Sequence, residues 1–312
     1  MFCLISKPVR CSLIVLLLVA GCHAEVSSNN AITKASALSR SGKRKQAEAV
    51  LRSAVAAHPD SADLHGALGE LLFRQQQYEQ AVQELGIAAQ AAPDSRQYNL
   101  LLAEALIGWR HFGVAVDFLN AVGARFGNEA QYHYDLGFAY YNLNKVAPAQ
   151  KELEEALRIM PNLDPAQYVL GGCLLAAGDS AGALREFRKL VQEKPGKATY
   201  WAALAQVLQA TGSQAEALRA AERALVLAPH DTHVQYVAAT LFTESGQFVR
   251  ARPYWERLER LDPSVLAVHV QLARVYSRLG ERDLARKESE AANELQARSS
   301  QPSTPADQPA NK

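Results

Sequence analysis

A period of 34 residues runs along this 312-residue chain and constrains its fold more than any other feature. Prolines mark the period, and one double interval between them has Gly127, another residue that ends helices, at its midpoint. The prolines are Pro59, Pro93, Pro161, Pro195, Pro229 and Pro263. A fixed period of this length predicts stacked supersecondary units, each of which contacts only its neighbours.

Two columns of small residues keep the same spacing. Alanine recurs from Ala47 to Ala285, and alanine or glycine recurs from Ala35 to Ala273. Small side chains are needed where two helices cross closely, and bulky residues such as Leu68 and Leu153 lie between the two columns. Alanine, leucine, glutamine, glutamate and arginine dominate these segments and favour helix, and no long stretch alternates like a β-strand. The pattern therefore predicts helical hairpins.

These columns resemble the tetratricopeptide repeat family, in which a small residue late in the first helix, an alanine in the second and a terminal proline form the signature. The fifth unit, YVLGGCLLAAGDSAGALREFRKLVQEKP, shows it clearly. The resemblance covers residues 28–297 and implies an all-α fold, a right-handed superhelical solenoid of about eight helix-turn-helix repeats. The repeats are expected to start near residues 28, 62, 96, 130, 164, 198, 232 and 266.

Residues 1–21 are predicted to be a lipoprotein signal peptide. Lys7 and Arg10 precede an apolar run that is shorter than the roughly 20 residues needed to span a membrane. Val19-Ala20-Gly21-Cys22 resembles the lipobox of bacterial lipoproteins, which implies lipidation of Cys22 and an anchor in the bacterial cell envelope. His23 after the cysteine resembles an outer-membrane address, with the protein facing the periplasm. An ordinary signal peptide or a short anchor with an incidental cysteine is the alternative interpretation.

The segments that flank the array carry no repeat pattern. Residues 22–27 are expected to form a short linker, and residues 298–312, rich in proline, serine and glutamine, a disordered tail. The net charge is +1, and positive and negative residues alternate as on a solvated surface, so nucleic acid is not an expected partner. Pro253 lies well inside a predicted second helix, where a kink or a late helix start is expected.

No catalytic residue, metal site or cofactor is predicted. His65, His133 and His269 share one repeat position, but ligands two repeats apart lie too far from a common ion, so they are interpreted as packing residues. Cys173 occupies a column that is otherwise apolar, which indicates a buried, inert thiol.

In this family the first helices of the hairpins line a concave groove that binds peptides or partner helices. Aromatic residues offer large contact areas at low entropic cost, and several lie in the columns expected to face that groove. Packing of some tyrosines within the array is the alternative. The predicted groove residues are Phe73, Arg74, Tyr134, Phe138, Tyr141, Tyr168, Tyr236, Arg274 and Arg278, with Arg40 beside Arg74 near one end.

Chaperone-binding members of the family clamp a peptide carboxylate with lysines and asparagines. The matching positions here hold Ile32, Ser36, Gly66, Glu70, Leu100 and Glu104, so binding of chaperone tails is not expected.

The resemblance implies a lipid-anchored envelope scaffold or adaptor that binds partner proteins or peptides through the groove, without a small-molecule substrate. A non-catalytic repeat subunit of an envelope enzyme, secretion, pilus or polysaccharide-export complex is the alternative. A catalyst is disfavoured, because the repeats leave no room for a catalytic domain.

Overall fold

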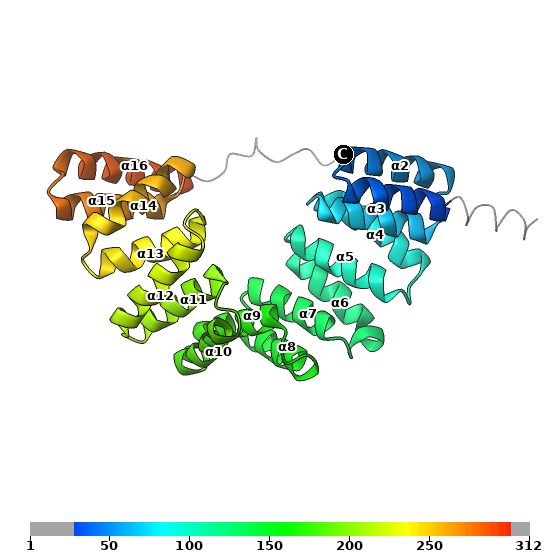
Figure 1. The fold of residues 1–312 in the computed structure, drawn as a ribbon, viewed down its shortest axis with the longest axis horizontal. Helices are drawn as coiled ribbons and strands as arrows, with labels where there is room; N and C mark the ends of the chain where they lie inside the picture. Colours follow the sequence, from blue (N-terminus) through cyan, green and yellow to red (C-terminus); the bar gives the residue numbers. More distant parts are fainter. Residues whose placement is uncertain (1–27, 301–312) are drawn as a thin grey trace, which may run out of the picture. The chain divides into compact units, whose positions relative to one another are not determined.

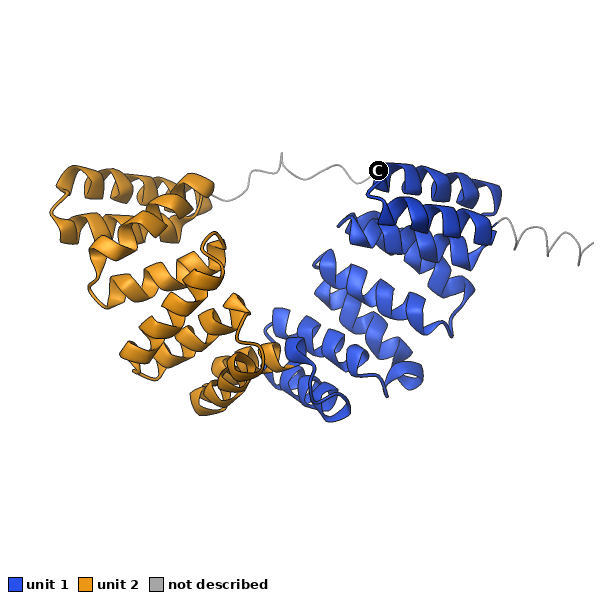
Figure 2. Cartoon of the chain, viewed as in Figure 1, with its two compact units in different colours: residues 1–166 blue, residues 167–312 orange. Residues whose placement is uncertain are grey.

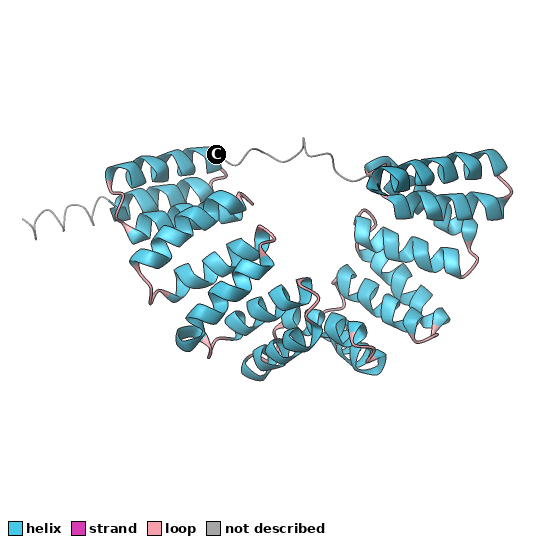
Figure 3. Cartoon of the chain, turned by 180° about the vertical axis from the view of Figure 1, so that it is seen from behind, coloured by secondary structure: helices cyan, strands magenta, loops and turns pink. Residues whose placement is uncertain are grey.

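The computed structural model describes residues 28–300, which are helical and contain no strand (Figure 1). Figure 3 shows the helices joined by short turns. The prediction of an all-α array of hairpins is confirmed. The expected signal peptide, Cys22 and the expected linker lie outside the described residues, as does the chain from residue 301 onward. Within the described part of the chain, none of the helices has both the length and the apolar character needed to cross a membrane.

Residues 28–40 form the first helix. The helices that follow are α2 (Arg44–Ala57), α3 (Ala62–Arg74), α4 (Tyr78–Ala91), α5 (Arg96–Gly108), α6 (Phe112–Phe126), α7 (Ala130–Asn142), α8 (Val146–Ile159), α9 (Asp164–Ala176), α10 (Ser180–Glu193), α11 (Ala198–Ala210), α12 (Gln214–Leu227), α13 (Thr232–Glu244), α14 (Phe248–Leu261), α15 (Leu266–Leu279) and α16 (Arg282–Ser300).

The helices alternate between two roles. We name the first helix of each hairpin, namely residues 28–40 and the odd-numbered helices from α3, an A helix, and the even-numbered helices B helices. Each of α3, α7, α11 and α15 packs on the B helix that follows it, and neighbouring A helices such as α5 and α7 also touch. The chain divides into two compact units, residues 1–166 and 167–312, which are described separately below (Figure 2).

A left-handed residue ends every A helix at the same repeat position. Five of these residues are glycines, from Gly42 to Gly280, and the other three are Gln76, Arg110 and Asn144, with φ near 60°. The following residue donates to a carbonyl five positions back, for example from Gln77 to Leu72 at 3.0 Å. This closes each A helix with a Schellman-type turn and directs the chain into its B helix.

Close helix crossings explain the columns of small residues. A Cβ atom added at Gly137 would lie 2.7 Å from Leu153 Cγ, and one at Gly171 would lie 2.6 Å from Phe187 Cζ. The bulky residue of the B helix therefore fills the space above the small residue of the A helix. The resulting cores include Leu153 and Trp255, both fully buried.

Pro253 lies inside α14, which begins at Phe248. The expected late helix start is therefore wrong. Proline lacks an N–H group, so the carbonyl of Val249 loses its helical donor. Val249 is 75% exposed, and water can satisfy that carbonyl instead. A kink at Pro253 stays a prediction.

The last helix is longer than expected. α16 continues to Ser300, three residues beyond the expected end of the array at residue 297. The start of the tail at residue 298 is corrected accordingly, because Arg298 still belongs to the helix and pairs with Glu294 at 3.6 Å.

Candidate functional site

The A helices of the first unit present one stripe of side chains with helical spacing. On α5 the stripe contains Gln97, Leu100 and Glu104, and on α7 it contains Gln131 and Phe138. Residues three, four and seven apart lie on the same side of a helix, so these side chains share a face. We call this surface the A-helix face.

A hollow of about 570 Å³ opens on the A-helix face. We name it the glutamate pocket, because Glu70, Glu104 and Glu129 contribute to its lining from three successive A helices or the turns beside them. Its other lining residues are Arg96, Gln97, Leu100, Leu101, Ala130, Gln131, Met160 and Leu163.

Two of the three glutamates are neutralised. Arg96 forms a bidentate ion pair with Glu129, in which both nitrogen–oxygen distances are 2.9 Å. Arg74 reaches Glu70 at 2.6 Å, and the Gln97 amide donates to the other Glu70 oxygen at 3.3 Å. Arg96 and Arg74 are therefore already paired with carboxylates that line the pocket.

Glu104 differs from the other two glutamates. It forms no hydrogen bond or ion pair with any residue from 28 to 300, and its side chain is half-buried. Burial raises the pKa of Glu104 above its ordinary value. An uncompensated carboxyl group therefore lines the pocket.

Asp135 is a buried neighbour of Glu104 on α7, with 2% of its surface exposed. The Gln131 amide donates to its Oδ1 at 2.9 Å, but its Oδ2 has no partner among the described residues. Burial raises the pKa of Asp135 well above its ordinary value, the charge of Glu104 adds to the rise, and the Gln131 hydrogen bond opposes it. Asp135 and Glu104 thus form a pair of carboxyl groups without a cation.

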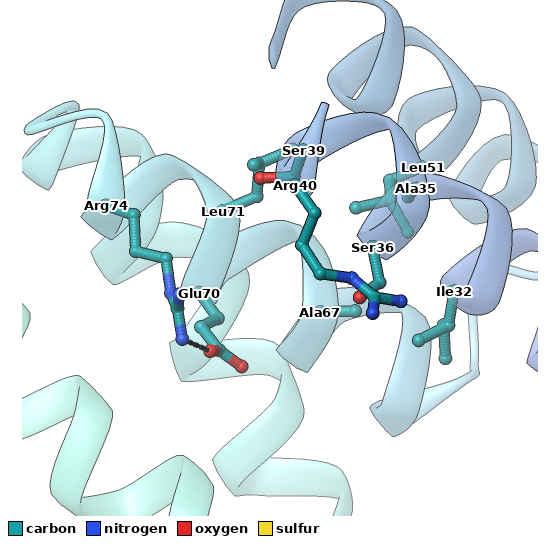
Figure 4. A pocket seen from close by; sticks show the side chains of 10 residues that line it. All are labelled: Ile32, Ala35, Ser36, Ser39, Arg40, Leu51, Ala67, Glu70, Leu71 and Arg74. Carbon is teal, nitrogen blue, oxygen red and sulfur yellow. Dashed lines mark hydrogen bonds and ion pairs between the residues drawn. The ribbon is translucent and has the colours of Figure 1, made fainter. Parts of the chain in front are cut away.

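A smaller hollow of about 220 Å³ lies next to the glutamate pocket, between residues 28–40 and α3 (Figure 4). Arg40 lines it, and at its edge the side chain of Arg74 points to Glu70. Glu70 belongs to both hollows, so the A-helix face changes from basic to acidic within one repeat.

The predicted aromatic residues of α7 continue the stripe that begins at Gln131. Tyr134 and Phe138 are half-buried with ring centroids 6.0 Å apart, and Phe138 also meets Phe112 of α6 at 6.4 Å. Tyr141 is 38% exposed. The aromatic row and the glutamate pocket therefore share one face of one helix.

The other predicted groove residues lie in different surroundings. Phe73 is half-buried against Tyr78, with ring centroids 5.8 Å apart. In the second unit, Tyr168 packs between Phe187 and Tyr200, with centroids 5.8 and 5.7 Å away.

Three further predicted groove residues belong to the second unit and are exposed. Tyr236 is 37% exposed, although its ring meets Trp255 edge-on at 5.2 Å. Arg274 and Arg278 are exposed on α15. Their role in a groove stays a prediction.

The three histidines that share a repeat position are structural. His65 Nδ1 lies 2.6 Å from Glu84 on the following B helix, and His65 Nε2 lies 2.8 Å from the carbonyl of Pro59 in the preceding turn. His133 and His269 repeat both contacts in their own hairpins. Asn99, Trp201 and Gln235 occupy the same column and donate to the corresponding carbonyl. In these six hairpins the column ties the A helix to the turn before it.

Cys173 is completely buried, and burial raises the pKa of its thiol to about 11. A thiol in this state is a poor nucleophile. Among residues 28–300, no group of three or more histidine, cysteine, aspartate or glutamate side chains could hold a metal ion.

Sequence reasoning missed the importance of Asp135. A weak signal was present, because five of the eight positions of the same repeat column are apolar, namely Ala67, Leu101, Val169, Ala203 and Val237, whereas Thr33 and Gln271 are polar and uncharged. A carboxyl group in a mainly apolar column indicates either a buried network or a ligand site.

Comparisons with known proteins agree with the geometry. The tetratricopeptide repeat family matches residues 38–105 and 149–207, and a second description of the same repeat matches residues 130–163. Cellulose synthase operon protein C of Xanthomonas axonopodis pv. citri is 32% identical over 149 residues, which is 45% of this chain but only 10% of that protein. The chain therefore matches about a tenth of this curated relative.

Solved structures show the same fold. A tetratricopeptide repeat protein from Parabacteroides merdae superposes with a TM-score of 0.68 at 16% identity, covering 80% of this chain and 98% of that one. PilW, a type IV pilus biogenesis factor, superposes with a TM-score of 0.60 at 18% identity, covering 67% of this chain and 97% of that one. The hairpins within residues 38–105 and 130–207 thus match the tetratricopeptide repeat, and the solved structures share the fold of the array.

Proposed function

We propose that this protein is a lipid-anchored scaffold of the bacterial cell envelope that binds a partner protein or peptide through the A-helix face of its first unit. The observation that carries the binding proposal is the continuous stripe on α7, where Gln131 lines the glutamate pocket and Tyr141 stands 38% exposed at the other end. Exposed aromatic side chains beside a polar hollow are typical of binding hot spots.

The anchor part of the proposal rests on the lipobox-like residues ending at Cys22. A scaffold fixed to a membrane by its first residue keeps its array available to partners in the same compartment. Radiolabelled palmitate should enter the wild-type protein in cells and should not enter a Cys22→Ala variant. Equal labelling of both proteins would contradict lipidation at Cys22 and therefore the proposed lipid anchor.

Site-specific crosslinking tests the binding face. A photoreactive phenylalanine analogue at Tyr141 should trap a partner in living cells, whereas the same analogue at Val114 should trap none. Val114 is a suitable control, because it is 52% exposed on the B helix α6 of the same unit. Equal trapping at both positions, or trapping only at Val114, would contradict the A-helix face as the binding surface.

A second candidate function is a non-catalytic subunit of a polysaccharide-synthesis complex. The similarity to cellulose synthase operon protein C favours it over the other envelope complexes, although that similarity covers a small part of the relative. The partner trapped at Tyr141 decides between the two, because this candidate requires a component of a glycan-synthesising complex.

A further inference from the structure

The pair of carboxyl groups formed by Glu104 and Asp135 has no structural role that the array accounts for. Among the described residues, four buried side-chain polar atoms lack a hydrogen-bond partner: Gln75 Nε2, Gln235 Oε1, Gln271 Oε1 and Asp135 Oδ2. Only Asp135 Oδ2 belongs to an ionisable group, and its neighbour Glu104 forms no hydrogen bond or ion pair with a described residue. A buried polar group without a partner costs free energy that a ligand can recover.

We propose that the glutamate pocket binds the cationic side chain of a lysine or arginine in a peptide segment of the partner protein, with Glu104 as its counter-charge and the neighbouring buried Asp135 as a supporting acidic group. This inference rests on the proposed binding function and specifies the chemistry that the pocket recognises.

The charges near the pocket favour a cation from outside. Arg96 is held by Glu129 and Arg74 by Glu70, so neither is available to neutralise the pair without giving up an existing contact. The nearest partner of Asp135 is the Gln131 amide, which is neutral. A ligand ammonium or guanidinium group would thus meet the Glu104 carboxyl group in a partly dehydrated site, where charge-assisted hydrogen bonds are strong.

The shape of the pocket suits a long basic side chain. Leu100 and Leu101 line it and can contact the methylene stem, while the Gln97 and Gln131 amide oxygens can accept further N–H groups. A volume of about 570 Å³ is ample for one such side chain together with neighbouring peptide groups. The aromatic residues of α7, of which Tyr141 is 38% exposed, then offer contact area for the residues that follow.

The negative charge of the pocket agrees with the absence of the cationic clamp that binds a peptide carboxylate in chaperone-binding members of the family. Glu70 and Glu104 occupy positions at which a carboxylate-binding groove needs cations. A peptide terminus with a negative charge would be repelled here, and a basic side chain would be attracted.

Selection from a phage-displayed library of random twelve-residue peptides tests the inference. The baits are the wild-type protein, the Glu104→Gln and Asp135→Asn variants, and a Glu79→Gln control. The first two substitutions keep the side-chain shape and remove the charge. Glu79 is exposed on the B helix α4, away from the pocket lining. Circular dichroism and urea unfolding establish that each bait is folded.

Wild type and Glu79→Gln should select peptides with lysine or arginine at one fixed position, and both pocket variants should lose this preference. Replacing that residue by norleucine in a selected peptide should weaken binding to wild type at least about tenfold, as expected for lost charge-assisted hydrogen bonds. It should change binding to Glu104→Gln much less. If Asp135→Asn does not fold, Glu104→Gln alone carries the comparison.

Two results would overturn the inference in distinguishable ways. Selected peptides without a basic preference, or with one that both variants keep, would refute the cationic pocket and leave the binding face in place. Selection of no peptide by folded wild type would count against peptide binding itself, and therefore against the proposed function as well.

Discussion

The His269–Glu288 contact allows a quantitative prediction, because both ring nitrogens of His269 face acceptors. Nδ1 lies 2.7 Å from Glu288 and Nε2 lies 2.9 Å from the Pro263 carbonyl. A neutral imidazole has only one N–H group, so satisfying both acceptors requires the imidazolium form. The side chains of His269 and Glu288 are 6% and 8% exposed, which makes this a buried charge pair.

The direction of the pKa shift supports this assignment. Burial alone lowers the pKa of His269, but the Pro263 carbonyl and the carboxylates of Glu288 on α16 and Glu259 on α14 outweigh it, leaving the pKa above 6.5. A group whose pKa is raised on folding contributes stability that is complete below the unfolded pKa. That stability is lost as pH rises through the folded pKa. The contact should therefore be strongest near pH 6 and weaken in alkaline solution.

Another repeat suggests which residue can replace His269. In the fifth hairpin the corresponding residues are Gln167 and Glu186, and the Gln167 amide nitrogen donates to the Glu186 carboxylate at 2.9 Å. His269→Gln should keep the hydrogen bond to Glu288 and lose the one to Pro263 and the positive charge. Loss of one hydrogen bond to a charged group corresponds to about 2 kcal/mol at pH 6. The difference from wild type should shrink at pH 9, where wild type has lost its own charge.

Urea unfolding followed by tryptophan fluorescence measures this difference. Trp255 is fully buried in the neighbouring hairpin and reports on the second unit. Hydrogen exchange of α15 and α16 localises the effect, since stability in repeat arrays is propagated mainly between neighbours. A stability difference that stays constant from pH 6 to pH 9 would refute the imidazolium assignment.

Three further predictions concern the turns and the core. Arg110→Gly should raise the stability by about 0.5–1 kcal/mol in urea unfolding, because Arg110 has a φ of 62° at a position where five repeats have glycine; an unchanged or lower midpoint would contradict the strain. Trp255→Ala should lower the stability by about 3–5 kcal/mol, since it empties the core and removes the donor to Thr243, whereas the exposed control Val249→Ala should change it by less than about 0.5 kcal/mol. Cys173 should react with a chromogenic disulfide reagent only in denaturant, and rapid labelling of the native protein would show that the thiol is accessible.

The fold was largely predictable because repetition supplies many independent copies of the same signal. One proline is a weak indicator of a helix end, but prolines spaced 34 residues apart, from Pro59 to Pro263, specify a hairpin length. The column of left-handed residues was less visible, because Gln76, Arg110 and Asn144 replace glycine in three successive units. Backbone conformation there follows from the turn geometry rather than from residue preference.

The candidate site was harder to predict, because a column fixes the direction of a side chain but not its neighbours. Tyr168 and Tyr236 occupy the same repeat column and were both expected in a groove. Tyr168 packs between the rings of Phe187 and Tyr200, whereas Tyr236 meets Trp255 and is 37% exposed. The repeat position of Tyr200 holds the smaller Val268 two repeats later, so the same column has different neighbours.

Whether a buried polar group has a hydrogen-bond partner within the protein distinguishes structural polar residues from candidate ligand contacts in this array. His65 and Asp135 both lie on A helices with little exposed surface. Each ring nitrogen of His65 has an acceptor within 2.8 Å, so a ligand could gain nothing there without breaking an existing contact. Asp135 has one oxygen without a partner, and its neighbour Glu104 raises its pKa rather than neutralising it. Gln75, Gln235 and Gln271 also have a buried amide atom without a partner, but these groups are neutral and offer a cation no charge. A carboxyl group that the packed hairpins leave without a cation is therefore the position where a partner's positive charge can be stabilised.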